Sequence, residues 1–392
     1  MSWASRLLRA AHAVERPFDV AKRRLAWRRG GDRPVHVVPY RGYGNRERLL
    51  ASGRVLLDAG IGTQGPSDPL WMNVVNTWRR FESDEVPGAR VALEIGGRRV
   101  ETVTDEEGYF SLELPPPPGA GPGWIELPVE IADLPPPLAG RPRQGGARLR
   151  VLLPPAEARF AVASDLDDTV VETGVTSKLV LARNVFLRNA HTRMPFPGVS
   201  AFYRALAGAA PEGFANPLFY VSASPWNLYD LIAGFLALQG LPEGPLLLRD
   251  LGLEPGRLVL KTSEETKLDQ LGRLFATYPA LPWILIGDSG ERDPEIYAEV
   301  IRRHPGRVLA VYLREVTGPH PVRRRQVAAL AEEVEAAGTP FLHVPDTVTA
   351  ALHAAARGWI RAEDVDWVRQ DRRLEEVRPT PAEAAAGGGE EG

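Results

Sequence analysis

Residues 34–154 contain short apolar runs that alternate with turn-forming residues. The runs are VHVVPY, GRVLLD, ARVALEI, RRVETVT, YFSLEL, WIELPVEI and ARLRVLL. Runs of this length, separated by Gly, Pro and Asp, are typical of an antiparallel β-sandwich. Within GARVALEIGGRRVETVTDEEGYFSLEL we expect two or three consecutive hairpin strands, with turns at Gly96-Gly97 and at Asp105 to Gly108. The proline-rich pieces at 115–123 and 134–146 should form loops or edges, because proline cannot donate to a strand ladder.

Residues 155–372 show a different pattern, in which apolar runs alternate with longer helical segments. The strand-like runs are RFAVASD, PLFYVSA, WILIGDSG and RVLAVYLREV, and the helical segments include NLYDLIAGFLALQG and LDQLGRLFATYP. Strands that are apolar on both faces and are separated by helices indicate a parallel sheet with helices on both sides. The sequence therefore predicts a doubly wound α/β domain after the β-sandwich.

The length of the chain also favours more than one domain, because 392 residues exceed what one hydrophobic core usually serves. We expect a basic helical segment at 1–33, the β-sandwich at 34–154, the α/β domain at 155–372 and a disordered low-complexity tail at 373–392. The β-sandwich resembles the small transthyretin-like domains that are appended to many enzymes. Its sequence shows no catalytic constellation.

The charge of the chain is nearly balanced, with 47 basic and 50 acidic residues and a net charge of -3. This balance argues against a globally basic surface, so we expect no nucleic-acid partner. The absence of cysteine excludes disulfides, thiolate metal sites and cysteine nucleophiles. The sequence has no apolar run of about 20 residues and no secretory signal, and we therefore expect a cytoplasmic protein.

The first 33 residues combine helical spacing with an excess of basic side chains. Trp3, Leu7, Ala11 and Val14 would share one face of a helix. A basic amphipathic helix is able to touch anionic lipid, which would place the protein at the periphery of a membrane. The alternative is a helix that packs on its own protein. We favour this second interpretation, because basic helices are common.

Polar residues gather where the strands of the α/β domain should end. In chain order they are Asp165, Asp167, Thr169, Ser222, Ser224, Lys267, Asp288 and Asp293. In such sheets ligands bind outside the carboxyl ends of the strands. Crowded carboxylates repel one another unless a hard cation neutralises them, and Mg²⁺ prefers carboxylates together with water and phosphate oxygens. The set therefore suits Mg²⁺ and a phosphoryl group.

The motif DLDDT at 165–169 resembles the D-x-D-x-T signature of the haloacid dehalogenase superfamily phosphatases, whose later parts follow here in the same order. Closer still, SDLDDTVVETG, FYVSASPWNLYD, TKLDQLGRLFATYP and GDSGERDPEIY resemble the actin-patch-protein type of phosphatidate phosphatase. RGYG and NTWRRFESDEV look like the domain that precedes the catalytic one in that family. Four parts in order are far more specific than one motif. The chain departs from the fungal members in lacking their long regions for cytoskeletal partners.

This resemblance implies a role for each candidate residue. Asp165 would attack phosphorus and form an aspartyl-phosphate, and Asp167 would protonate the leaving oxygen and then activate water. Ser222 and Thr169 would bind the phosphoryl group, and Lys267 would balance the charge of Asp165 and of that group. The implied ligands of Mg²⁺ are Asp165, Asp167, Asp288 and Asp293.

Each assignment has a structural alternative. Lys261 competes with Lys267, which we prefer because the helical pattern LDQLGRLF begins beside it and the family's lysine lies at a helix start. An Asp at a strand end often only caps a helix or forms a turn, and Asp168 is expected to point away from the site. We expect Ser224 to cap the SPWNLYD helix, with Pro225 at its first position.

The segment between Thr169 and the next strand is too short for a large folded cap over the site. An open site would admit a phosphate on a bulky group, and His191 and Arg193 are candidate substrate contacts in this segment. By the family resemblance the substrate is phosphatidate, which would be hydrolysed to diacylglycerol. Two alternatives remain, namely the same chemistry on a nucleic-acid end, soluble phosphomonoester or phosphoprotein, and a non-catalytic interaction protein.

Overall fold

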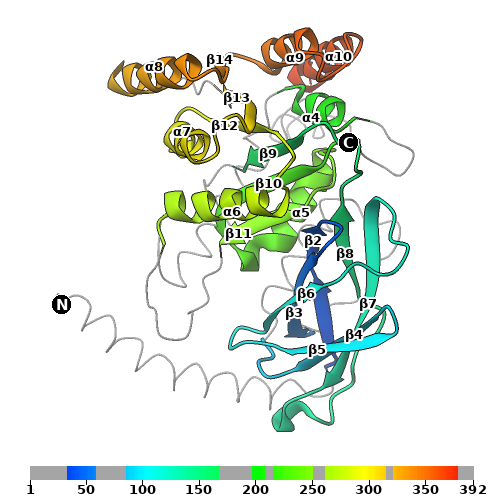
Figure 1. Ribbon diagram of the computed structural model, residues 1–392. Coiled ribbons are helices and arrows are strands. Elements are labelled where there is room, and N and C mark those ends of the chain that lie inside the picture. Colours follow the sequence, from blue (N-terminus) through cyan, green and yellow to red (C-terminus); the bar gives the residue numbers. More distant parts are fainter. Residues whose placement is uncertain are drawn as a thin grey trace, which may run out of the picture. The chain divides into compact units, whose positions relative to one another are not determined.

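The computed structural model describes residues 33–58, 85–166, 197–208, 215–249, 261–314 and 321–377. Its residues divide into two compact units (Figure 1). The first unit extends to Val151, and the second begins at Leu152 and also takes in Gly121–Gly123. The predicted basic segment at 1–33 therefore lies almost wholly outside the described residues, as does the predicted tail after residue 377.

The first unit is built from strands that hydrogen-bond in the order β1-β3-β2-β8-β7-β4-β5, with β6 added on β3. β1, β2 and β6 pair with β3, and β5 and β7 pair with β4, all in antiparallel registers. The strands are β1 (Val35–Pro39), β2 (Arg41–Gly44), β3 (Leu49–Leu57), β4 (Arg90–Ile95), β5 (Arg98–Val103), β6 (Tyr109–Leu114), β7 (Gly123–Asp133) and β8 (Arg148–Leu153). A short 3-10 helix, η2 (Pro136–Leu138), follows β7.

Alternation of side chains explains these strands. In β6 the second, fourth and sixth residues are buried and the others are exposed or half-buried, as expected where one face of a strand covers a core. The buried faces of β1, β3, β4, β6, β7 and β8 contribute to one hydrophobic core that includes Leu49, Leu57, Leu93, Leu114 and Leu149. The seven strand-like runs predicted from the sequence are all strands, while β2 was not predicted.

The two predicted turns both form, but they have different consequences. Gly96 and Gly97 have φ angles of 57° and 74°, the left-handed conformation that a tight two-residue hairpin needs, and they join β4 to β5. At the second turn the Gly108 amide donates to the Asp105 carbonyl at 3.1 Å. The strand that follows, β6, pairs with β3 rather than extending the hairpin. Of the two or three consecutive hairpin strands predicted, two are therefore confirmed and the third is not, because side-chain alternation does not specify which edge a strand joins.

The second unit contains a parallel sheet of six strands in the order β11-β10-β9-β12-β13-β14. All the neighbouring pairs are parallel. The strands are β9 (Ala161–Asp165), β10 (Leu218–Pro225), β11 (Leu246–Arg249), β12 (Trp283–Asp288), β13 (Val308–Arg314) and β14 (Phe341–Val344). This result confirms the predicted parallel sheet and α/β class. β10 is buried at every position, which accounts for its unbroken apolar run.

Helices cover this sheet. They are α4 (Val199–Ala207), α5 (Tyr229–Leu238), α6 (Ser263–Thr277), α7 (Asp293–Arg303), α8 (Pro321–Ala336), α9 (Thr347–Ala356) and α10 (Asp364–Val377), with a short 3-10 helix η3 (Trp226–Leu228) before α5. α6 packs on β10 and α7, and α7 packs on β12 and α8. The helices α6, α7 and α8 are therefore neighbours in this order (Figure 1). α4 packs on α9 and α10. Residues 373–377, placed in the disordered tail by the sequence, belong to α10.

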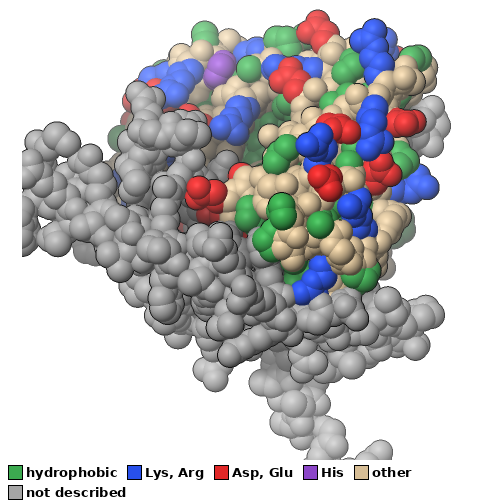
Figure 2. Space-filling view, turned by 90° about the horizontal axis from the view of Figure 1, so that it is seen from below, with side chains coloured by type: hydrophobic (Ala, Val, Ile, Leu, Met, Phe, Trp, Pro, Cys, Tyr) green, Lys and Arg blue, Asp and Glu red, His purple; other side chains and the backbone are tan. Residues whose placement is uncertain are grey.

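Charged side chains of both signs are interspersed on the face shown in Figure 2, where no broad patch of one sign stands out among the coloured residues. Charged side chains of the first unit also form ion pairs, such as Arg99 with Glu101 and Glu130 at 2.9 and 2.8 Å. Among the described helices, none has the length and apolar character that crossing a bilayer requires.

Candidate active site

The order of the parallel strands predicts a ligand-binding site beside β9. β10 and β11 lie on one side of β9, and β12, β13 and β14 lie on the other. The chain reverses its direction of travel across the sheet between β11 and β12, so the crossover connections beside β9 leave on opposite faces. A crevice outside the carboxyl ends of the strands is expected at such a point. Asp165 and Asp288 are the last residues of β9 and β12, and they border this crevice.

Asp165 and Lys267 form a buried ion pair at this edge. The Lys267 Nζ lies 2.7 Å from an Asp165 carboxylate oxygen, and the two side chains are 4% and 3% exposed. The same ammonium lies 2.9 Å from Asp293 Oδ1, whose side chain is fully buried, and 3.5 Å from Glu291 Oε2. One ammonium therefore meets three carboxylates, and burial makes each of these contacts stronger than it would be in water.

The position of Lys267 follows from how α6 begins. Thr262 caps the helix by accepting the Glu265 amide at 3.1 Å, and the Glu265 carboxylate accepts the Thr262 amide at 2.8 Å. This capping box starts the helix at Ser263, four residues before Lys267. The lysine therefore lies in the second turn of the helix, and the expectation that it opens the helix is wrong. The signal was present in the sequence as the spacing T-S-E-E.

The same face of α6 also reaches the end of β10. Gln270, three residues after Lys267 and thus its neighbour on the helix surface, donates from Nε2 to the Ser222 carbonyl at 3.0 Å. The Ser222 hydroxyl accepts the Ser224 amide at 3.0 Å and is buried. Ser222 is adjacent to Val221, which is in register with Asp165. α6 thus fixes the position of Lys267 relative to β10.

The structure decides two expectations from the sequence, namely that Ser224 caps a helix and that Lys267 rather than Lys261 contacts Asp165. Ser224 is not an N-cap, because β10 continues through Pro225 and the following helix has no side-chain cap. Pro225 itself occupies the cap position instead of the first helical position. Lys261 lies away from the carboxylate cluster, where its half-exposed side chain pairs with Asp269 at 2.7 Å. Lys267 is therefore the lysine that contacts Asp165, as preferred from the sequence.

The segment 287–293, which runs from the end of β12 through the loop to the first residue of α7, is organised by its own carboxylates. Asp293 Oδ2 accepts the Asp288 amide at 2.9 Å, and Asp288 Oδ1 accepts the Gly290 amide at 2.6 Å. Asp288 Oδ2 lies 3.4 Å from Arg314 Nε at the end of β13. Asp293 therefore joins the backbone of β12 to Lys267 through its two carboxylate oxygens. Its side chain is held by β12 on one oxygen and by α6 on the other.

Gly287 allows this close approach. A Cβ atom at position 287 would collide with the Asp293 carboxylate and come within 2.8 Å of the Tyr297 ring. The Tyr297 hydroxyl donates to the Ile286 carbonyl at 2.7 Å and ties α7 to β12. Burial, followed by the charges of Asp293 and Asp165, raises the pKa of Tyr297 well above its ordinary value. Tyr297 is therefore a neutral hydrogen-bond donor throughout the physiological pH range.

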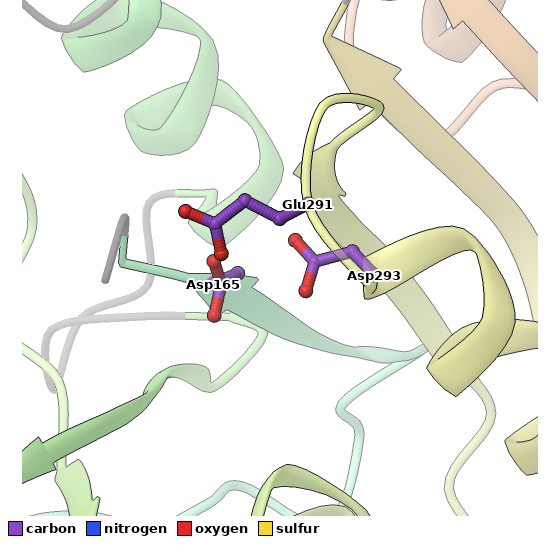
Figure 3. A group of neighbouring side chains, drawn as sticks. All are labelled: Asp165, Glu291 and Asp293. Atoms are coloured by element: carbon purple, nitrogen blue, oxygen red, sulfur yellow. The ribbon is translucent and has the colours of Figure 1, made fainter. Parts of the chain in front are cut away.

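Three carboxylates form a group that could hold a metal ion. They belong to Asp165, Glu291 and Asp293, and their oxygens lie within 4.8 Å of one another. Figure 3 shows the three side chains converging from the end of β9, from the loop and from the start of α7. The donor set consists of hard oxygen atoms that carry more negative charge than Lys267 alone supplies in return. This chemistry fits a hard divalent cation.

The group differs in part from the predicted set of ligands. Asp165 and Asp293 are in it, Glu291 was not predicted, and Asp288 lies outside it with Arg314 and Gly290 as partners. The signal for Glu291 was its place in GDSGERD, between two acids already chosen. The ligand role of Asp288 stays a prediction. Asp167, Asp168, Thr169, His191 and Arg193 lie outside the described residues.

Comparison with known proteins agrees with this geometry. Residues 160–315 match the sequence model of a family described as "Phosphatidate phosphatase APP1, catalytic domain". We call residues 160–315 the APP1-type segment. The predicted resemblance to the actin-patch-protein type of phosphatase is confirmed for the APP1-type segment, which contains Asp165, Ser222, Lys267 and the loop 287–293.

Two curated relatives each match 40% of the chain. Phosphatidate phosphatase APP1 of Saccharomyces cerevisiae is 32% identical over 156 residues, which are 40% of this chain and 26% of the yeast protein. An uncharacterized protein of Schizosaccharomyces pombe is 28% identical over 164 residues, 40% of this chain and 25% of that protein. The chain thus spans about a quarter of the length of these relatives. A solved carbohydrate acetylesterase from Xanthomonas citri covers 77% of this chain and 66% of its own, at 13% identity and a TM-score of 0.27.

Proposed function

We propose that this chain is a Mg²⁺-dependent phosphatase that hydrolyses phosphatidate to diacylglycerol through an aspartyl-phosphate. The observation that carries the proposal is the contact of Lys267 with both Asp165 and Asp293 at the carboxyl edge of the sheet. A nucleophilic carboxylate needs a nearby positive charge, because it must approach an anionic phosphate. The match of residues 160–315 to the APP1 catalytic domain supports the choice of a lipid phosphate.

In this mechanism each residue of the candidate active site has a distinct task. An Asp165 oxygen attacks phosphorus and displaces the alcohol, and water then releases phosphate from the carboxylate. Lys267 holds Asp165 in place and offsets charge on the transferred group. Ser222, a buried residue of β10, is proposed to bind a phosphoryl oxygen. Asp167 is proposed as the acid and base at the leaving oxygen, with Thr169 orienting its loop.

Mg²⁺ would be held by Asp165 and by carboxylates of the loop after β12. Asp293 and Glu291 belong to the group that suits a cation, and Asp288 begins the same loop. Asp167 is retained as a proposed ligand on the family resemblance alone. When bound, Mg²⁺ supplies positive charge that polarises a phosphoryl oxygen and neutralises the crowded carboxylates.

We also propose the finer features of the architecture. The parallel sheet with its site beside β9 supports a haloacid dehalogenase-like domain at 155–372. The two groups of antiparallel strands that share one core support a transthyretin-like β-sandwich at 34–154. Residues 1–33 are proposed to be a basic helix that packs on its own protein, with contact to a membrane surface from the cytoplasm as the alternative, and residues beyond α10 to be a disordered tail.

The first test is phosphate release from phosphatidate vesicles and from soluble phosphomonoesters, each with Mg²⁺ and with EDTA. We expect release from phosphatidate in Mg²⁺, no release in EDTA, and a loss of at least about 10³-fold in Asp165→Asn, because an amide cannot replace the nucleophile. Asp269→Asn is a matched control, since Asp269 also pairs with a lysine at 2.7 Å but at the surface.

The outcomes separate the alternatives. Preference for a soluble phosphomonoester, a phosphoprotein or a nucleic-acid end would keep the chemistry and reject the lipid substrate. Full activity in Asp165→Asn would reject the assigned nucleophile. No release from any substrate by the folded wild type would favour an interaction protein.

A further inference from the structure

Arg323, near the start of α8, reaches back to the loop that carries the acidic residues. Its side chain is 18% exposed, which is low for an arginine on a helix surface. The residue lies eight positions beyond the end of the APP1-type segment at residue 315. The next two residues, Arg324 and Arg325, are exposed. Arg323 is therefore singled out by its burial among three consecutive arginines.

The guanidinium of Arg323 donates four hydrogen bonds to this loop and to the first turn of α7. Nη2 donates to the Glu291 carbonyl and, at 2.9 Å, to Glu295 Oε2, while Nη1 donates to Glu295 Oε1. Nε donates to the Ser289 carbonyl at 3.4 Å. A planar fork with several donors in fixed directions can make such a set of contacts, and a lysine ammonium cannot.

The two carbonyls belong to the residues on either side of Gly290, and glycine has the widest conformational freedom of any residue type. From the other side, the Gly290 amide donates to Asp288 Oδ1 at 2.6 Å. The backbone that carries Glu291 is thus held between a carboxylate of β12 and the guanidinium of α8. Without Arg323 the Glu291 and Ser289 carbonyls would lose their charged donor, and the loop would gain conformations in which Glu291 leaves the carboxylate group.

We propose that Arg323 is a positioning residue for the proposed metal site, and that α8 thereby fixes the acidic loop after β12. The inference rests on the proposed function for its metal, and it assigns a role to a residue outside the APP1-type segment. Arg323 is not one of the three carboxylate residues of the group that could hold the metal, and it would act through the backbone that carries Glu291. An ordinary ion pair with Glu295 is the competing explanation, and it would contribute to stability without affecting cation binding.

The test measures binding of Mn²⁺, a probe that carboxylate sites accept in place of Mg²⁺, from the electron paramagnetic resonance signal of the free ion. The full chain is compared with Arg323→Lys, Arg323→Ala and the exposed control Arg324→Ala. Loss of a residue that orients metal ligands usually weakens affinity by about 10- to 100-fold. We expect at least about a tenfold loss in Arg323→Lys, a larger loss in Arg323→Ala and no change in Arg324→Ala.

Thermal unfolding without metal is recorded for the same proteins. Arg323→Lys that binds Mn²⁺ as the wild type does, with or without a lowered unfolding temperature, would overturn the proposal, because the arginine would then be only structural. Wild type that binds no Mn²⁺ would overturn it together with the metal site. Wild type that binds Mn²⁺ but releases no phosphate would reject the phosphatase function, and the comparison of the Arg323 variants would still decide the role of Arg323.

Discussion

At the scale of residues, the site depends on one buried cation. Lys267 contacts Asp165, Asp293 and Glu291, and its side chain is 4% exposed. Removal of one partner from a buried set of charges is far more costly than removal of a surface pair, because the remaining charges are left without compensation. Lys261, which has one partner at 2.7 Å and is half-exposed, provides the comparison within the same chain.

We therefore expect Lys267→Met to lower the free energy of unfolding by about 3–5 kcal/mol at pH 7 without divalent ions. Lys261→Met should lower it by less than about 1 kcal/mol, as for other surface pairs. Urea denaturation followed by fluorescence measures both values. An equal loss of unfolding free energy in the two variants would contradict this expectation, because the three carboxylates would then be neutralised by something other than Lys267.

The sequence revealed most of these residues but not their contacts. Asp165, Lys267 and Asp293 were chosen because they were expected at strand ends and helix starts in a known order, and they do meet in the structure although Lys267 lies in the second turn of its helix. Glu291 was missed because an acid inside a loop has no periodic signal. Arg323 was missed because its function depends on packing between α7 and α8, which are separated in sequence by a strand.

At the scale of elements, helix α6 sets the geometry of the site. One face of the helix carries Lys267 toward the carboxylates and Gln270 toward the end of β10. The capping box at Thr262 and Glu265 fixes where this helix begins. A helix that frays at its first turn would release the lysine, which lies only one turn further on.

Thr262→Ala should lower the free energy of unfolding by about 1 kcal/mol, because the Glu265 amide loses its acceptor. Thr262→Ser keeps the hydroxyl and should cost only a few tenths of that value. Chemical denaturation of the two variants tests this difference. A cost in Thr262→Ser as large as in Thr262→Ala would assign the effect to the threonine methyl group and not to the cap.

The elements themselves were predicted unequally. Unbroken apolar runs identified β9, β10, β12 and β13, because strands buried on both faces need no polar positions. β2 and β14 have four residues each and were too short to show a period. The pairing of β6 with β3 joins segments about sixty residues apart, and no local pattern encodes such a choice.

At the scale of the whole molecule, the chain consists of two compact units. The first has its own hydrophobic core, which includes Leu93 and Leu149. The second contains the candidate active site. Units with separate cores are expected to unfold as separate cooperative steps, and a ligand stabilises only the unit that binds it.

Calorimetry of the full chain should therefore show two transitions, of which Mg²⁺ raises only the one that belongs to the second unit. At 100 times its dissociation constant the ion should add about 2.7 kcal/mol to that unit. Leu93→Ala should lower only the other transition, by about 2–5 kcal/mol. If Leu93→Ala and Mg²⁺ shifted the same transition, the two units would be one cooperative structure.

The strand β14 has a consequence for where this domain should be cut. Phe341 to Val344 pair with Val311 to Arg314, so β14 covers an edge of β13. A recombinant fragment that ended at residue 315, where similarity to the family ends, would uncover the backbone groups of β13 and invite aggregation. It would also lack Arg323. The unit that sequence comparison delimits is therefore smaller than the unit that can be expressed as a stable, working protein.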